Sequence, residues 1–174
     1  MSTKKVWFIT GASKGFGLEF IKQLLAKGDA VAATSRNLSQ LKEAAATNGD
    51  NFLPLEMEIT SEASVKEAIE ATIAAFGRID MLVNNAGYGL VGGVEELTDA
   101  EARRNFDVNV FGSLNVIRAA MPQLRKQGSG HILNFSSIAG VTGSFPAFGI
   151  YCATKFAVNG FTEALALEAK PFGI

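Results

Sequence analysis

The sequence predicts a doubly wound α/β fold, in which helices cover both faces of a parallel sheet. Short apolar segments alternate with longer amphipathic ones along the whole chain, a pattern typical of parallel sheets. A glycine-rich loop directly follows the first apolar segment. Neither a repeat nor a linker divides the 174 residues, so we expect one domain over residues 1–174. Right-handed crossovers with a reversal after the third strand give the strand order 3-2-1-4-5.

The predicted strands are short and apolar, as expected for strands buried in a parallel sheet. In chain order they are residues 5–10, 30–35, 51–57, 79–87 (which runs into a loop) and 131–137. Pro54 weakens the third strand, because proline has no backbone N–H to donate to a neighbouring strand.

The predicted helices follow the strands. Residues 16–28 carry apolar side chains at helical spacing, and Gly28 is suited to end the helix. Thr98 and Glu101 form a capping box before the fourth helix. The remaining helices are predicted at residues 38–47, 61–77, about 99–126 and about 151–170.

The composition excludes several classes of protein. Hydrophobic residues make up 48% of the chain and charged residues 19%, enough for a packed core and unlike a disordered chain. The net charge of −1, without a basic run, argues against a nucleic-acid surface. One cysteine, Cys152, and one histidine, His131, allow no intramolecular disulfide and disfavour zinc, so we expect both residues to be structural and no metal to be bound. No signal peptide or membrane-spanning stretch is present, and we expect a cytoplasmic protein without a membrane partner.

The glycine loop TGASKGFG, residues 10–17, lies between the first strand and the first helix. Its glycines Gly11, Gly15 and Gly17 allow a tight turn, a close approach to a pyrophosphate and close packing of helix on strand. The start of the helix offers free N–H groups and a partial positive charge to phosphates. This context predicts nucleotide binding rather than an ordinary turn.

The end of the second strand indicates which nucleotide binds. NAD-binding proteins place a carboxylate here for the ribose 2′-hydroxyl. This chain has TSRN instead, with Arg36 at that place and Lys14 in the glycine loop. An arginine fork binds a 2′-phosphate with charge-assisted hydrogen bonds worth roughly 1.5–3 kcal/mol. We therefore expect NADP(H), with NAD(H) the less favoured cofactor.

Four motifs stand in order: TGASKGFG (10–17), NNAG (84–87), NVFG (109–112) and YCATK (151–155). Together they resemble the short-chain dehydrogenase/reductase family over the whole chain. The resemblance implies a Rossmann-type dinucleotide-binding domain that transfers hydride between NAD(P) and a carbonyl/alcohol pair, and Lys14 and Arg36 resemble the NADP-preferring branch of the family. In the family, sixth and seventh strands and a substrate-covering segment follow. They are absent from this sequence, so we expect a C-terminally incomplete domain of five strands.

The resemblance also assigns roles to residues. It implies a catalytic tetrad of Asn109, Ser137, Tyr151 and Lys155. It implies cofactor contacts from Gly11, Ser13, Lys14, Gly15, Phe16, Gly17, Arg36, Glu58, Ile59, Asn85, Ala86, Gly87, Tyr151 and Lys155. Glu58 stands where the family usually has aspartate. Ser136 remains the alternative to Ser137, because Ser137 lies one position further from Tyr151 than is usual in the family.

Tyr151 and Lys155 suit proton transfer at a carbonyl oxygen. Spaced four residues apart, they lie on one face of a helix. A lysine cation about 4 Å away stabilises a tyrosinate by about 4 kcal/mol at an effective dielectric near 20. By resemblance, Lys155 also holds the nicotinamide ribose and Asn109 supports a water-linked proton path. Ser137 would hydrogen-bond the substrate oxygen.

The substrate and the partners are predicted more coarsely. Loop residues Tyr88, Leu90, Phe145 and Phe148 favour a small apolar carbonyl or alcohol substrate. The resemblance implies a homodimer or homotetramer through the helices near 99–126 and 151–170. The alternative is a catalytically silent nucleotide-binding or partner-binding module, because the substrate-covering segment is missing.

Overall fold

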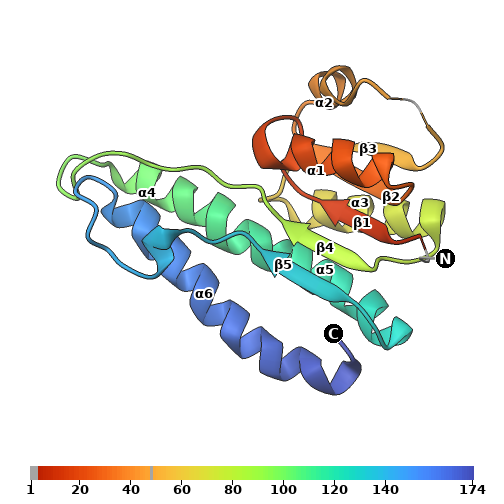
Figure 1. Cartoon of the computed structure of the whole chain (residues 1–174). Coiled ribbons are helices and arrows are strands. Elements are labelled where there is room, and N and C mark those ends of the chain that lie inside the picture. The colour runs from red at the N-terminus through yellow and green to blue at the C-terminus, as the bar shows by residue number, and fades with distance from the viewer. Residues whose placement is uncertain (1–3, 48) are drawn as a thin grey trace.

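The computed structural model describes residues 4–47 and 49–174 and contains one parallel sheet of five strands. The strand order is β3-β2-β1-β4-β5, which confirms the predicted fold class and topology (Figure 1). The strands are β1 (Val6–Ile9), β2 (Ala30–Ser35), β3 (Phe52–Glu56), β4 (Met81–Asn84) and β5 (His131–Asn134).

Helices cover both faces of the sheet. They are α1 (Gly15–Ala26), α2 (Leu38–Ala45), α3 (Glu62–Phe76), α4 (Asp99–Phe106), α5 (Gly112–Gln127) and α6 (Gly149–Ala169). Because neighbouring strand residues point to opposite faces, Ile9 and Val83 pack with α1 and α2, while Phe8 and Leu82 pack with α3 and α5. In Figure 1, α4 and α5 form one long helical segment that runs beside α6. None of the helices in the described ranges is long and apolar enough to cross a membrane.

The third strand keeps its proline because it lies at the edge of the sheet. Pro54 is paired with Ala33 of β2, and β3 has no strand on its other side in the sheet. A proline in an edge strand leaves the ladder to its single neighbour largely intact. The predicted strand at 51–57 is therefore present as β3, shortened by one residue at each end.

The predicted helix over 99–126 is divided into three parts. The capping box of Thr98 and Glu101 is confirmed and starts α4. A π-helical turn at Asp107–Phe111 then separates α4 from α5. Sequence periodicity did not predict this turn, because its side chains follow the same apolar spacing. Turns of this kind often mark functional sites.

The strands predicted at 79–87 and 131–137 are shorter than expected. The chain leaves the sheet after Asn84 in β4 and after Asn134 in β5. The Asn84 side chain donates to Asn134 Oδ1 at 2.8 Å, which joins the carboxyl ends of the two strands. The residues beyond both ends form loops that contribute to the site described below.

Two helical glycines provide a matched test of the packing. A Cβ at Gly17 in α1 would lie 2.7 Å from the Gly11 carbonyl oxygen, whereas a Cβ at the exposed Gly160 in α6 would meet nothing within 4 Å. We expect Gly17→Ala to lower the free energy of unfolding by about 1–3 kcal/mol through overpacking. Gly160→Ala should raise it by about 0.5–1 kcal/mol, because alanine loses less backbone entropy. Urea unfolding measures both, and equal effects would contradict the packing described at Gly17.

Candidate functional site

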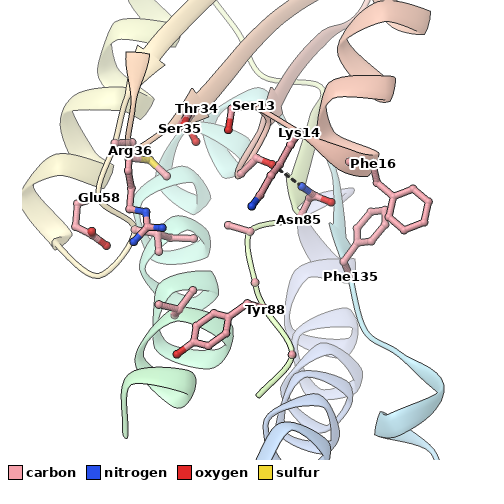
Figure 2. A pocket seen from close by; sticks show the side chains of 18 of the residues that line it. Ser13, Lys14, Phe16, Thr34, Ser35, Arg36, Glu58, Asn85, Tyr88 and Phe135 are labelled. Carbon is pink, nitrogen blue, oxygen red and sulfur yellow. Dashed lines mark hydrogen bonds between the residues drawn. The ribbon is translucent and has the colours of Figure 1, made fainter. Parts of the chain in front are cut away.

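A cavity of about 830 Å³ lies at the carboxyl ends of the strands. This is the place where doubly wound sheets bind ligands, and the volume is within the usual range of ligand sites. Figure 2 shows the glycine loop, the end of β2 and the loop after β4 around this cavity. Of the predicted cofactor residues, Gly17 alone is not at its surface. The others that line it are Gly11, Ser13, Lys14, Gly15, Phe16, Arg36, Glu58, Ile59, Asn85, Ala86, Gly87, Tyr151 and Lys155.

Hydrogen bonds clamp the glycine loop to the loop after β4. Thr10 Oγ1 accepts from the backbone N–H groups of Asn85 and Ala86 at 3.1 and 3.0 Å. The Asn85 side chain donates to the Thr10 carbonyl at 2.9 Å and to the Gly11 carbonyl at 3.0 Å, the latter drawn as a dashed line in Figure 2. Gly11 has a φ of +66°, and a Cβ there would lie 2.7 Å from Ala86 Cα. The contact therefore requires glycine, and the Asn85 amide group holds the loop in place.

The start of α1 fits a phosphate group. Lys14 precedes the helix, and no side chain caps its first turn. Gly15 and Phe16, whose N–H groups belong to that turn, line the cavity. Uncapped N–H groups at a helix start provide hydrogen-bond donors and a partial positive charge. The glycine loop thus has the donors and the free space that a dinucleotide pyrophosphate requires.

At the end of the cavity next to β2 and β3, the carboxylate of Glu58 lies near two cations, Arg36 and Arg104. Arg36 is exposed at the end of β2 and lies on the same side of the cavity as Glu58 (Figure 2). Glu58 Oε1 accepts hydrogen bonds from the Thr60 backbone and hydroxyl at 3.1 and 2.8 Å. Burial alone would raise the pKa of the Glu58 carboxyl, but the bonds from Thr60 and the charges of Arg104 and Arg36 together lower it. Glu58 is therefore an anion at neutral pH.

Tyr151 and Lys155 lie at the other end of the cavity, both from α6. Lys155 Nζ is 5.7 Å from the centre of the Tyr151 ring and donates to the Phe135 carbonyl at 2.8 Å. Lys155 is only 7% exposed, and this burial lowers the pKa of its ammonium group. The structure thus brings the predicted pair together and fixes the lysine against the end of β5.

Asn109 lies in the π-helical turn, behind the cavity surface. Its side-chain nitrogen donates to the Tyr88 carbonyl at 2.9 Å and to Thr154 Oγ1 at 3.1 Å. Its Oδ1 accepts from the Tyr88 N–H at 3.0 Å, and a Cβ at Gly87 would approach that oxygen to 3.1 Å. Asn109 therefore ties the loop after β4 to α6, and it does not line the cavity itself.

The two serines after β5 have different surroundings. Ser136 lines the cavity, and its hydroxyl donates to the Lys155 carbonyl at 3.4 Å. Ser137 is not among the lining residues, and its Oγ accepts from the Ala139 N–H at 3.2 Å at the start of a short 3₁₀ turn. The assignment of the substrate-binding serine to Ser137, with Ser136 as the alternative, therefore stays a prediction.

Only one of the four residues predicted to line the substrate pocket lies at the surface of the cavity, and several residues that were not predicted also lie there. Tyr88 lines the cavity, whereas Leu90, Phe145 and Phe148 do not. The Phe148 ring instead packs edge-on against the Tyr151 ring, with 6.1 Å between the ring centres. Other residues at the surface of the cavity were not predicted from the sequence, among them Gln40, Met57, Arg104, Val108 and Phe135. None belongs to a recognisable motif. The one signal in the sequence is that Arg104 and Val108 lie four residues apart and close to Asn109, a spacing too common to predict either residue.

The fold and the site define a dinucleotide-binding protein of the Rossmann type. A family profile described as short chain dehydrogenase matches residues 5–174, and the chain belongs to this family of NAD(P)-dependent oxidoreductases. It is 42% identical to a 3-ketodihydrosphingosine reductase of Bacteroides thetaiotaomicron, over 98% of this chain and 60% of that protein. The chain spans 60–62% of the length of this and two further curated relatives.

Solved structures agree with this assignment. A short-chain dehydrogenase from Streptomyces avermitilis superposes with a TM-score of 0.93 at 40% identity, over 100% of this chain and 64% of the other. ElxO with NADP bound gives 0.91 at 32% identity, over 99% and 71%. A 3-ketoacyl-(acyl-carrier-protein) reductase from Brucella melitensis complexed with NADH gives 0.90 at 35% identity, over 97% and 71%. The similar structures thus include one with NADP and another with NADH.

The burial of Lys155 predicts a dependence of stability on pH. Because burial lowers its pKa, the unfolded chain binds more protons than the folded chain between the lowered pKa and that of a solvated lysine. In that window stability rises with pH. We expect the free energy of unfolding of the native chain, minus that of Lys155→Met, to increase from neutral pH towards alkaline pH. Lys126→Met, at an exposed position of α5, is the matched control, and a difference that falls with pH would contradict the burial.

Proposed function

We propose that the protein is an NADP(H)-dependent oxidoreductase that interconverts a carbonyl and an alcohol, with Tyr151 as the acid/base. One observation carries this proposal. Arg36 lies at one end of a single cavity, after β2, the glycine loop lies in the middle, after β1, and Tyr151 and Lys155 lie at the other end, beside the loop after β5. A nucleotide held at the first end would extend towards the proton-transferring group at the second. The alternative of a catalytically silent module is less well supported, because it gives the Tyr151 hydroxyl beside the buried lysine no role.

The chemistry of the chain's own residues follows from their positions. Bound NADP(H) would supply or accept the hydride. Tyr151 would donate its hydroxyl proton to the carbonyl oxygen in reduction and accept it back in oxidation. Lys155, fixed by the Phe135 carbonyl, would stabilise the tyrosinate and bind the adjacent ribose. Asn109 would hydrogen-bond Tyr88 and Thr154 and so hold the loop after β4 at a fixed position relative to α6.

The preference for NADP(H) rests on charge. Arg36 and Lys14 line the cavity, and no carboxylate stands at the end of β2, where residues 34–37 read TSRN. Residues at this place that bind NAD accept hydrogen bonds from the 2′-hydroxyl, which these cations cannot do. The NADP complex of ElxO is compatible with this preference, although a similar reductase binds NADH.

The proposed substrate is an apolar ketone or the matching alcohol. The names of two similar proteins, a 3-ketodihydrosphingosine reductase and a 3-ketoacyl-(acyl-carrier-protein) reductase, both describe keto compounds. Phe148 packs edge-on against Tyr151, and Tyr88 lines the same cavity, so apolar surface is available to such a substrate. We further propose a cytoplasmic homo-oligomer formed through α4–α5 and α6, since Phe111, in the π-helical turn between α4 and α5, and Phe156 of α6 are exposed.

The proposal is tested by Tyr151→Phe. Loss of a positioned general acid costs about 10²–10⁴ in rate, so we expect kcat with an apolar ketone and NADPH to fall by that factor. The dissociation constant of NADPH should stay within about twofold, because the aromatic ring remains in place. Stopped-flow absorbance and calorimetry measure the two quantities. Unchanged turnover would contradict the role of Tyr151, and a native chain that binds NADPH without reducing any ketone of a panel would contradict the proposed activity.

A further inference from the structure

Arg104 of α4 lines the nucleotide end of the cavity, and its charge on the Glu58 carboxylate has not yet been linked to ligand binding. Its guanidinium lies 3.7 Å from Glu58 Oε2, and both residues line the cavity. The two side chains are 45% and 39% exposed, so their charges are partly shielded by water. Arg104 therefore belongs to the site by position, although no motif includes it.

Glu58 is held where its charge opposes an anionic ligand. Thr60 fixes one carboxylate oxygen with two hydrogen bonds, which leaves Oε2 directed towards Arg104. Arg36 is close enough to Glu58 for its charge to act on the carboxylate. A 2′-phosphate bound by Arg36 would carry nearly two negative charges and would be repelled by Glu58. A 2′-hydroxyl would experience no such repulsion.

We propose that Arg104 is a specificity-determining residue, which neutralises Glu58 so that the cavity accepts nucleotides with a 2′-phosphate. This inference rests on the proposed use of NADP(H). Arg104 acts through Glu58 and is a positioning residue rather than a catalytic one. With the Glu58 charge compensated, Arg36 and Lys14 give this end of the cavity a net positive charge that matches the additional phosphate.

The helix holds Arg104 in place and supplies a control. The capping box of Thr98 and Glu101 fixes the first turn of α4, and the π-helical turn that contains Asn109 fixes its other end. The neighbouring Arg103 points elsewhere, because its Nε donates to Asp99 Oδ2 at 2.7 Å. Arg103 does not line the cavity. Arg103→Gln removes the same charge from the same helix without affecting Glu58.

The experiment measures dissociation constants by calorimetry for NADPH, NADH and 2′,5′-ADP, which carries the 2′-phosphate without nicotinamide. We expect Arg104→Gln to weaken NADPH and 2′,5′-ADP by roughly three- to fivefold and to leave NADH within about 1.5-fold. Arg103→Gln should leave all three within about 1.5-fold of native. In the Glu58→Gln background, Arg104→Gln should no longer weaken NADPH, because the charge that Arg104 compensates is gone.

Each other result would contradict one step of this proposal. Equal weakening of NADPH and NADH by Arg104→Gln would show a general effect on the cavity and would contradict the specificity role. Weakening that persists in the Glu58→Gln background would show that Arg104 acts directly on the phosphate and would contradict neutralisation. A native chain that binds NADH more tightly than NADPH would overturn the proposed cofactor, and with it this inference. A native chain that prefers NADPH while Arg104→Gln changes nothing would overturn this inference alone.

Discussion

The site depends on the hydrogen-bonded clamp between the loops that leave β1 and β4. Thr10 Oγ1 and the Asn85 amide group join these loops with four bonds of 2.9–3.1 Å. The clamp places Gly87 and Tyr88 against the π-helical turn, where Asn109 holds the Tyr88 backbone on both sides. A continuous set of hydrogen bonds therefore runs from the glycine loop to Asn109 and from there to α6.

The two ends of the cavity use charge in opposite ways. At the nucleotide end, the cations are exposed, so each contributes modestly and their sum favours an anionic ligand. At the end that holds Tyr151, Lys155 is buried, which makes its charge costly to keep. The exposed charges thus lie where the proposed anionic ligand would bind, and the buried charge lies beside Tyr151, the proposed acid/base.

The sequence predicts the fold and most of the cavity, because both depend on local patterns. Apolar periodicity predicts the strands, and the glycine loop and NNAG follow strand ends, where parallel strands bring them together. The sequence could not predict the π-helical turn, since its spacing resembles that of an α-helix. It also could not predict Arg104 or Phe135, which reach the cavity through packing of elements far apart in the chain. The role of Ser137 depends on a substrate pose that neither pattern nor packing fixes.

A crystal structure of the protein with NADP⁺ tests the central claim most directly, namely that one cavity holds the nucleotide between Arg36 and Lys155. The account predicts the 2′-phosphate within hydrogen-bonding distance of the Arg36 guanidinium, the pyrophosphate at the start of α1 and the nicotinamide ribose at Lys155 Nζ. A nucleotide bound in this cavity in the reverse direction, or bound outside it, would contradict the account.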